Sequence, residues 1–488
     1  MQAIETSISG VEQAISQKLT AEISKLSSSL SPLHLLPDDI LYLIFDTAQC
    51  AEWYPVTDRT APLWVSSQTC QRWRSVALCN PSLWRRFCVD GRNKDFQVPK
   101  DPLSMVKAWL ARSQSVPLQG RVYIEGYDPN IEEELMELVG DESHRWLELY
   151  LDVDRRVDLY YSFAAKEESF PLLRTLELVL CPFEDDDPTH NNRTLAFPGS
   201  FRAPNLTCAS ILIYTNSITM TRNIPTIPLP WHQLTHYTTI YYDQEFFGIT
   251  VKLLNLQSLK LRIEYGSPQA LSPSTPHLTL SNLRSLEWLE WHCGEVRAAV
   301  AFMNQLTLPV LEELVLGLND AAIPSDEAAD SLSHAIAALQ QRSSCQIQEL
   351  TICTGTLTSP NSARLSLPTV RVLHMSIDYL GQTDAVQQKA WEALRNSALY
   401  PNMTALHIEL RLWAVKGHVD FIPALVEVIE ARRTKASSAA TRLASVRLEA
   451  GFLRHAQRCL FPADSSAYQR LLELQRDGLE LSGSVFPW

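Results

Sequence analysis

A short apolar phrase recurs through the last two thirds of this 488-residue chain. Its pattern is a proline, any residue, an apolar residue, any two residues, a second apolar residue, any residue and a final apolar residue. Clear copies begin at Pro171, Pro309, Pro368 and Pro401; copies without the proline begin near 254, 281, 345 and 441, and degenerate ones at Pro204 and His232. Successive copies start 22 to 40 residues apart. Because one copy cannot bury its own apolar side, a recurring phrase predicts a stacked array.

Each phrase predicts a short strand, and the segments between phrases predict helices. The last two apolar residues of a phrase alternate to one side, as in a strand whose neighbours complete a parallel sheet. A parallel connection needs a crossover, and helical periodicity occurs at 296–303, 325–339, 386–394 and 425–429. Residues 91–165 predict two further helices, at 103–110 and 131–139, and two strands, at 118–126 and 146–153. We interpret them as early, atypical repeats that cap the array.

The strand phrase and its period resemble leucine-rich repeats, although the Asn or Cys usual after the motif occurs here only at Cys181 and Asn319 among the better copies. The resemblance implies an α/β fold, an irregular solenoid over 166–460 with parallel strands inside and helices outside, then a C-terminal helix and tail over 461–488. Such arrays bind through the exposed sheet face. The residue between the last two apolar positions points there, giving these target-binding candidates: Glu177, Lys260, Glu287, Val315, Thr351, His374, His407 and Arg447.

A second feature is the apolar stretch LLPDDILYLIFDTAQC at 35–50. Pro37 suits a helix start, and Asp38 and Asp39 complement the positive end of the helix dipole. The helix is apolar over more than half its circumference, so it needs more cover than one small neighbour provides. A second helix is expected from residue 62 until Asn80-Pro81 stops it, followed by a brief third turn.

These segments resemble the F-box. Its ordered pattern is present as Leu36, Pro37, Asp39, Ile40, Leu41, Ile44, Phe45, Cys70, Trp73, Arg74, Leu83 and Trp84. The longer link over 46–63, together with a heptad-like helix upstream, is similar to F-box proteins of basidiomycete fungi. The resemblance implies a small all-α module over 32–90 that docks onto the Skp adaptor of an SCF-type ubiquitin ligase, and through it onto cullin and RING subunits. The adaptor-binding residues it implies are Leu36, Pro37, Ile40, Leu41, Ile44, Phe45, Cys70, Trp73, Arg74, Leu83 and Trp84. The competing interpretation is a helical hairpin that buries all of these residues itself.

The first 31 residues predict an amphipathic helix. Apolar residues recur every three or four positions from Ile4 to Leu30, but a run of four-residue steps breaks a strict heptad. We expect this helix to dock on its own domain or to self-associate weakly.

Composition and motifs favour binding over catalysis. The net charge of −13 argues against nucleic acid and anionic membranes. The ten cysteines form no C-x-x-C pair, and His232 and His236 have no companion ligands, so no metal or cofactor is expected. No phosphate loop or nucleophile elbow occurs. We therefore hypothesise a non-catalytic substrate-recognition subunit of an SCF-type ligase, in the cytoplasm or nucleus; the alternative is a non-ligase scaffold whose helical module only caps the array.

Overall fold

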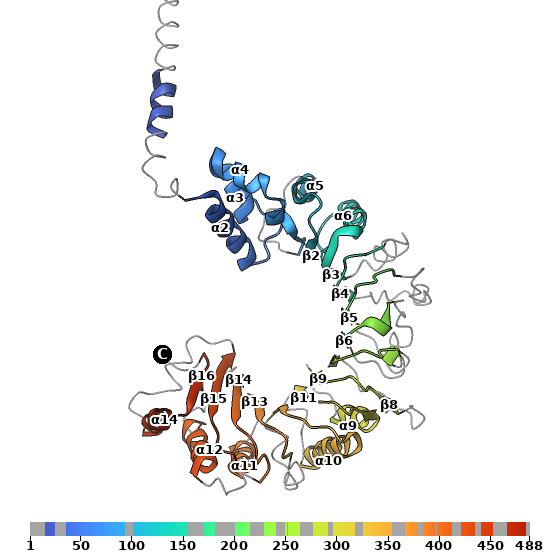
Figure 1. Cartoon of the computed structure of the whole chain (residues 1–488), viewed down its shortest axis with the longest axis vertical. Helices are drawn as coiled ribbons and strands as arrows, with labels where there is room; N and C mark the ends of the chain where they lie inside the picture. Colours follow the sequence, from blue (N-terminus) through green and yellow to red (C-terminus); the bar gives the residue numbers. More distant parts are fainter. Residues whose placement is uncertain are drawn as a thin grey trace, which may run out of the picture. The chain divides into compact units, whose positions relative to one another are not determined.

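The computed structural model (Figure 1) describes residues 15–24, 36–92, 101–154, 169–180, 201–214, 229–240, 249–250, 252–263, 277–290, 296–317, 326–353, 367–378, 384–396, 398–411, 421–434, 441–451 and 466–484. The chain divides into two compact units, here called unit 1 (Met1–Leu138) and unit 2 (Val139–Trp488). Of the predicted N-terminal helix, residues 15–24 are described, and they are helical. Cys181, Asn319 and the tail residues 485–488 lie outside the described residues.

Unit 1 is mainly helical. Its elements are α2 (Asp38–Ala51), α3 (Pro62–Thr69), α4 (Gln71–Cys79), the 3-10 helix η2 (Pro81–Arg85), β1 (Arg86–Asp90), α5 (Pro102–Ser113), β2 (Leu118–Tyr123) and the first part of α6 (Pro129–Asp141). As predicted, α2 follows Pro37 and carries two aspartates in its first turn. Strands β1 and β2 pair in parallel.

The single helix expected from residue 62 to Asn80 is wrong, because the chain breaks it at Cys70. This residue is extended (φ −154°, ψ 167°) and separates α3 from α4. Its Sγ atom accepts a hydrogen bond from the Trp73 amide at 3.4 Å, so the sulfur caps the new helix start. Helical periodicity alone does not detect such a break, since apolar residues continue through it.

A tryptophan cluster forms the centre of unit 1. The rings of Trp64, Trp84 and Trp109 meet edge to face with centroids 4.8–5.7 Å apart. Each indole N–H is satisfied by a carbonyl oxygen, with Trp109 donating to Trp84 O at 2.9 Å. Since Trp109 belongs to α5, the core of unit 1 extends beyond residue 90, the predicted end of the F-box-like module.

Unit 2 contains a large parallel sheet, which confirms the α/β class. Its strand order is β3 (Trp146–Asp154), β4 (Thr175–Leu180), β5 (Cys208–Ile213), β6 (His236–Ile240), β7 (Ser258–Ile263), β9 (Ser285–Glu290), β11 (Glu313–Gly317), β12 (Glu349–Cys353), β13 (Val372–Asp378), β14 (Ala405–Arg411), β15 (Ser445–Gly451) and β16 (Glu480–Ser482). Each of the recurring phrases contains one of these strands. A separate two-stranded sheet pairs β8 (Leu278–Thr279) with β10 (Leu306–Thr307).

The long helices of unit 2 lie on one side of this sheet (Figure 1). They are α9 (Val296–Asn304), α10 (Asp326–Ser343), α11 (Asp384–Arg395), α12 (Phe421–Thr434) and α14 (Ser466–Arg476). Two short 3-10 helices, η3 (Ser143–Arg145) and η5 (Trp231–Gln233), precede β3 and β6. No helix in the described part of the chain is long and apolar enough to cross a bilayer.

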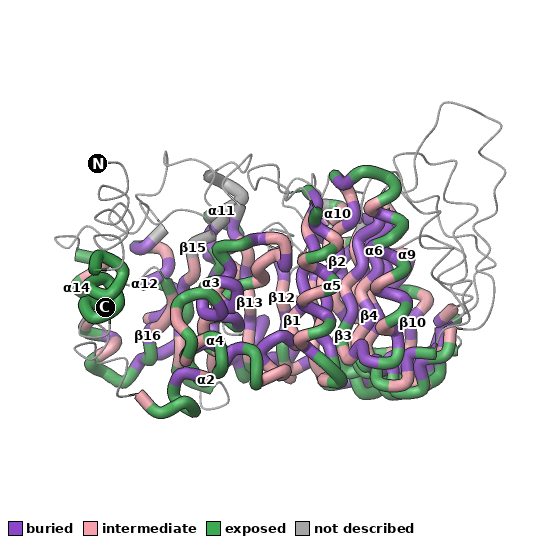
Figure 2. The backbone as a smooth tube through the Cα atoms, turned by 90° about the horizontal axis from the view of Figure 1, so that it is seen from above, coloured by how far each residue is buried: buried purple, intermediate pink, exposed green. Residues whose placement is uncertain are grey.

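The core of unit 2 contains rows of inward-facing apolar residues that repeat in register from strand to strand. Leu286, Leu314, Leu350, Leu373 and Leu406 are consecutive partners across β9 to β14, and all are buried. Along β7, β9 and β11 to β15, buried residues alternate with more exposed ones, whereas in β4 and β5 Val179 and Leu212 on the other face are buried as well (Figure 2 colours the backbone by burial). The helix-facing side is therefore the core, and the other side remains as a separate face of the sheet.

Two sets of side chains connect neighbouring repeats. Asparagines at the second position of a phrase donate Nδ2 to the first carbonyl of the preceding phrase at 2.6–2.9 Å: Asn205 to Pro171, Asn255 to His232, Asn282 to Leu254 and Asn402 to Pro368. These asparagines connect the loops of neighbouring repeats, although most copies lack the Asn or Cys that usually follows the motif.

Buried arginines connect neighbouring helices. Arg342 on α10 donates to the carbonyls of Met303 and Leu306 at the end of α9, at 2.7 and 2.8 Å. On α12, Arg432 donates three hydrogen bonds of 2.7–2.9 Å to the carbonyls of Leu394, Asn396 and Tyr400. Burial lowers the pKa of Arg432 to about 10, so it stays charged at neutral pH and satisfies helix-end carbonyls.

Candidate docking surfaces

Helix α2 presents apolar side chains to both the core and the solvent. Leu41 and Phe45 are 0% and 2% exposed, whereas Ile40, Leu43 and Ile44 are 37%, 55% and 44% exposed. Leu36 is half-buried and Pro37 is exposed at the start of the helix. We call the outward-facing set the α2 surface: Leu36, Pro37, Ile40, Leu43 and Ile44.

Two ion pairs hold α2 in this orientation. Arg72 of α4 contacts Asp38 at 2.6 Å and also donates to the main-chain carbonyl of Leu36. Near the other end of α2, Arg85 of η2 contacts Asp46 at 3.1 Å. Asp38 lies in the first turn of α2 and Asp46 in its second half, and neither residue belongs to the α2 surface.

The adaptor-binding residues that the sequence resemblance implies differ in how far they are buried. Leu41, Phe45, Leu83 and Trp84 are buried in unit 1, so they contribute to any binding by supporting the fold. Trp73 is half-buried, and its ring meets that of Phe45 edge to face at 5.1 Å.

The Cys70–Arg74 segment has mainly local contacts. Cys70 caps α4, and the exposed Arg74 donates Nε to the carbonyl of Ser67 at 2.6 Å. Leu43, the most exposed apolar residue of α2, was not among the implied residues. Helical spacing gave no signal for it, because so much of the helix circumference is apolar.

The longer link after α2 packs on the strands of unit 1. The Val56 amide donates to Cys88 O on β1 at 2.7 Å, and Val56 is fully buried. Trp53 lies between two guanidinium groups, those of Arg86 and Arg121, at 4.3 and 4.5 Å from its ring. The link is thus part of the core of unit 1.

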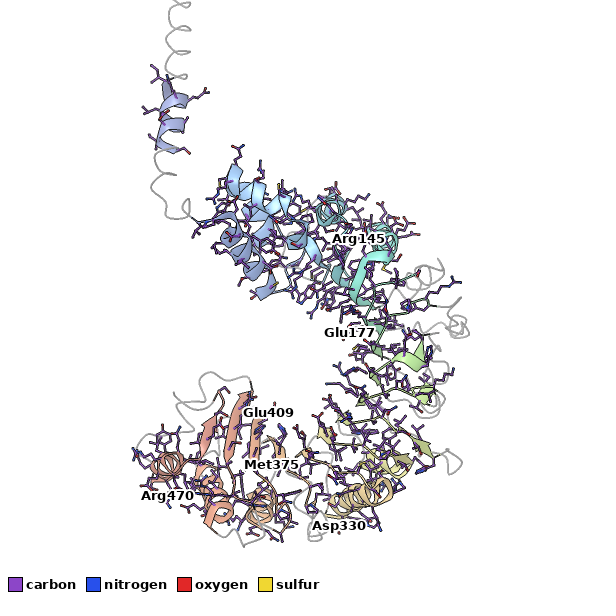
Figure 3. The ribbon with its side chains drawn as sticks, in the orientation of Figure 1. Arg145, Glu177, Asp330, Met375, Glu409 and Arg470 are labelled. Carbon is purple, nitrogen blue, oxygen red and sulfur yellow. The ribbon has the colours of Figure 1, made fainter. Side chains whose placement is uncertain are left out.

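The second surface is the side of the unit 2 sheet that faces away from the helices, here called the open face. One residue per strand pairs in register across it, forming a central row: Tyr150, Glu177, Ser210, Thr238, Lys260, Glu287, Val315, Thr351, His374, His407, Arg447 and Ser482. All of the sequence-predicted candidates belong to this row. Figure 3 shows Glu177 on this side and Asp330 of α10 on the helical side.

Sequence reasoning missed Tyr150, Ser210, Thr238 and Ser482 in the central row. Their strands come from degenerate phrases or, for β3 and β16, from no phrase at all. Alignment by the last apolar pair of each segment would have identified Ser210 and Thr238.

Charges on the open face are mostly negative. Residues two positions before or after the central row share its face. Among the described strand residues, the cations are Lys260, Arg262 and Arg447, and the carboxylates are Glu148, Asp152, Glu177, Glu287, Glu313, Glu349, Glu409, Glu449 and Glu480. Lys260 and Glu287 form a cross-strand ion pair at 2.8 Å, and Arg447 pairs with Glu449.

His374 and His407 are in direct contact on adjacent strands. Their rings meet edge to face at 88° with centroids 4.4 Å apart, and their Nδ1 atoms are 3.3 Å apart. Burial lowers the pKa of both imidazoles. Arg447 lowers both further, while carboxylates of Glu313 and Glu349 act in the opposite direction.

Other features of the described residues give less support for a functional site than these two surfaces do. No group of three or more His, Cys, Asp or Glu side chains there is arranged to hold a metal ion. Burial raises the pKa of the Cys88 thiol to about 12, which makes it a poor nucleophile at neutral pH. On the repeats, Trp231 and Trp288 are buried core residues.

Comparison with protein-family models and with curated proteins finds no match for this chain.

Proposed function

We propose that this protein is a substrate-recognition subunit of an SCF-type ubiquitin ligase. In this proposal the α2 surface binds a Skp adaptor, which links the chain to cullin and RING subunits, and the open face binds a target protein. The observation that carries the proposal is the division of α2 into a buried and an exposed apolar side. The F-box-like sequence pattern is independent support for the same helix.

The α2 surface has the composition expected at the centre of a protein interface. Interface cores are depleted of charge, and a few large apolar side chains carry most of the binding energy. Here Ile40, Leu43 and Ile44 expose side chains on one helix, while the ion-paired residues Asp38 and Asp46 lie outside this set. A flat apolar surface with fixed geometry suits a constant partner such as an adaptor.

The open face has the different composition expected of a target-binding surface. Its parallel strands, with inward apolar residues in register and the described long helices on one side, support an irregular leucine-rich-repeat-like solenoid. Binding through this face requires no catalytic group in the chain, because associated subunits would transfer ubiquitin.

Co-purification of the full chain with a Skp adaptor tests the proposal. A fragment ending near residue 95 is unsuitable, since it would lack Trp109 and β2 and so part of the unit 1 core. We expect a one-to-one complex by size-exclusion chromatography with light scattering. A double change, Leu43→Asp with Ile44→Asp, should abolish it.

The control is Leu254→Asp, which introduces one aspartate at an apolar residue that is 67% exposed in unit 2. This variant should keep the complex. If the unaltered chain forms no complex, the proposal fails, and the alternative of a non-ligase scaffold whose helical module only caps the array is favoured.

A further inference from the structure

We propose that His374 and His407 chelate a divalent transition-metal ion, with zinc the expected metal, on the open face of unit 2. The two side chains supply two nitrogen ligands from adjacent strands. The remaining coordination positions face away from the helices, where water or a side chain of a bound protein can occupy them. The proposal goes beyond the adaptor function and does not depend on it.

The separation of the two Nδ1 atoms fits a shared metal ion. Zinc binds imidazole nitrogen at about 2.0–2.1 Å, and two ligands at a tetrahedral angle are then about 3.3–3.4 Å apart. In the structure, Nδ1 of His374 and Nδ1 of His407 are 3.3 Å apart. The same separation allows one ring to donate a hydrogen bond to the other, so the pair is preorganised with or without metal.

Strands β13 and β14 fix the positions of the two histidines relative to each other. His374 and His407 are direct register partners in β13 and β14, and their neighbours Leu373 and Leu406 are fully buried in the core. Fixed backbone on both sides of each histidine limits the freedom lost when a metal binds. Two ligands that are already in contact thus form a better site than two exposed histidines elsewhere.

Carboxylates near the histidine pair favour a bound cation. Metal ligands must be deprotonated, so zinc and protons compete for the two imidazoles. Carboxylates from three neighbouring strands act on the pair: Glu313 of β11, Glu349 of β12 and Glu449 of β15. The one opposing cation, Arg447, is already paired with Glu449.

Calorimetric titration of the full chain with zinc chloride at pH 7.5, after removal of bound metal with EDTA, tests the proposal. His374→Gln and His407→Gln keep hydrogen-bonding capacity but remove a metal ligand. Each should weaken the tightest zinc-binding event at least about tenfold, the cost typical of disturbing a metal site. The control His334→Gln alters an exposed histidine on α10, on the helical side, and should leave that event unchanged.

The same titration at pH 5.5 should show weaker binding, because protons compete for both nitrogens. Identical zinc isotherms for the unaltered chain and all three variants would overturn the proposal. So would an equal loss in the His334→Gln control.

A second measurement on the unaltered chain covers the case in which a variant does not fold. Zinc should protect His374 and His407 from modification by diethylpyrocarbonate, read by mass spectrometry, while His334 stays reactive. Equal modification of all three with and without zinc contradicts the proposal.

Discussion

The two units differ in the side chains that their two-sided elements expose: apolar ones on α2 of unit 1 and mainly polar ones on the sheet of unit 2. In unit 1, α2 places apolar residues on both sides, and its outer side is Ile40, Leu43 and Ile44. In unit 2, each strand is apolar toward the helices and mainly polar on the open face. An apolar surface favours one partner that stays bound, whereas a polar row favours specificity and exchange. The comparison suggests one constant partner for unit 1 and selective partners for unit 2.

The units also differ in how they are held together. Unit 1 depends on a few large aromatic residues, Trp64, Trp84, Trp109 and Phe45, which have many contacts each. Unit 2 spreads its stability over many repeated contacts: the inward apolar residues of each strand, the asparagines between loops and the arginines between helices. Single changes should therefore be most damaging in unit 1.

The largest effect is expected from Phe45→Ala. Loss of this buried ring and of its contact with Trp73 should lower the free energy of unfolding by about 3–5 kcal/mol. On the same helix, Ile40→Ala should change it by less than about 0.5 kcal/mol, because Ile40 is partly exposed. Calorimetric unfolding of the two variants checks the two-sidedness of α2; equal destabilisation would mean that α2 has no separate outer side.

Arg432→Gln should be the most damaging single change to the repeat contacts in unit 2. It removes the guanidinium donors to the carbonyls of Leu394, Asn396 and Tyr400, of which the last two keep one backbone donor each, at an expected cost of about 2–3 kcal/mol. The control Arg470→Gln removes a fully exposed guanidinium on α14, visible in Figure 3, and should not change unfolding measurably. A similar result for both arginines would contradict the role of burial.

Leu43→Ala should weaken adaptor binding while leaving unfolding nearly unchanged. Truncation of an apolar residue at an interface centre costs about 1–2 kcal/mol, or roughly five- to thirtyfold in affinity. Biolayer interferometry with an immobilised Skp adaptor measures this. Thr351→Ala, in the central row of the open face, should leave adaptor affinity unchanged. A loss of adaptor affinity in this variant would contradict the proposal that the two surfaces bind different partners.

Asn402→Ala tests the contact between loops. Loss of the 2.6 Å hydrogen bond to Pro368 O should lower the free energy of unfolding by about 1 kcal/mol. Denaturant titration measures it, and Asn396→Ala gives a comparison on the helical side. No change at Asn402 would show that the leucine rows alone hold the repeats in register.

The smallest effect is a pH dependence of unit 2. Because His374 and His407 have pKa values below the ordinary value near 6.5, the unfolded chain binds protons more readily than the folded one. Their contribution to stability is complete above pH 6.5 and is lost as pH falls through the lowered folded values. Melting temperatures between pH 8 and pH 5 should fall more steeply for the unaltered chain than for the double variant His374→Gln with His407→Gln. Parallel slopes would show that neither histidine has a lowered pKa.

Sequence reasoning succeeded where one strong period controls local structure. Each phrase became a strand, and the predicted target-binding residues fell in one row, because a side-chain period of two leaves little freedom once one face is buried. It failed at Cys70, where apolar residues continue across a break between helices. It also missed β1 and β16, which lack the phrase and are defined by their strand partners.

The candidate surfaces show the same limit. The sequence identified α2 as apolar on two sides, but not that Leu41 and Phe45 face the core while Leu43 faces solvent. The asparagine contacts did have a signal, since Asn occupies the second position in four phrases. The arginine contacts, whose carbonyl partners lie 32–39 residues away, had none, because these arginines do not occupy a fixed position in the recurring phrase.

The sequence by itself determined the α/β class, the strands of unit 2 and the row of residues on its open face, because hydrophobic periodicity acts over a few neighbouring positions. The tertiary structure decided which apolar residues of α2 remain exposed, where the second helix breaks, and that His374 and His407 touch. These depend on packing between segments distant in the chain, and neither period nor propensity contains that information.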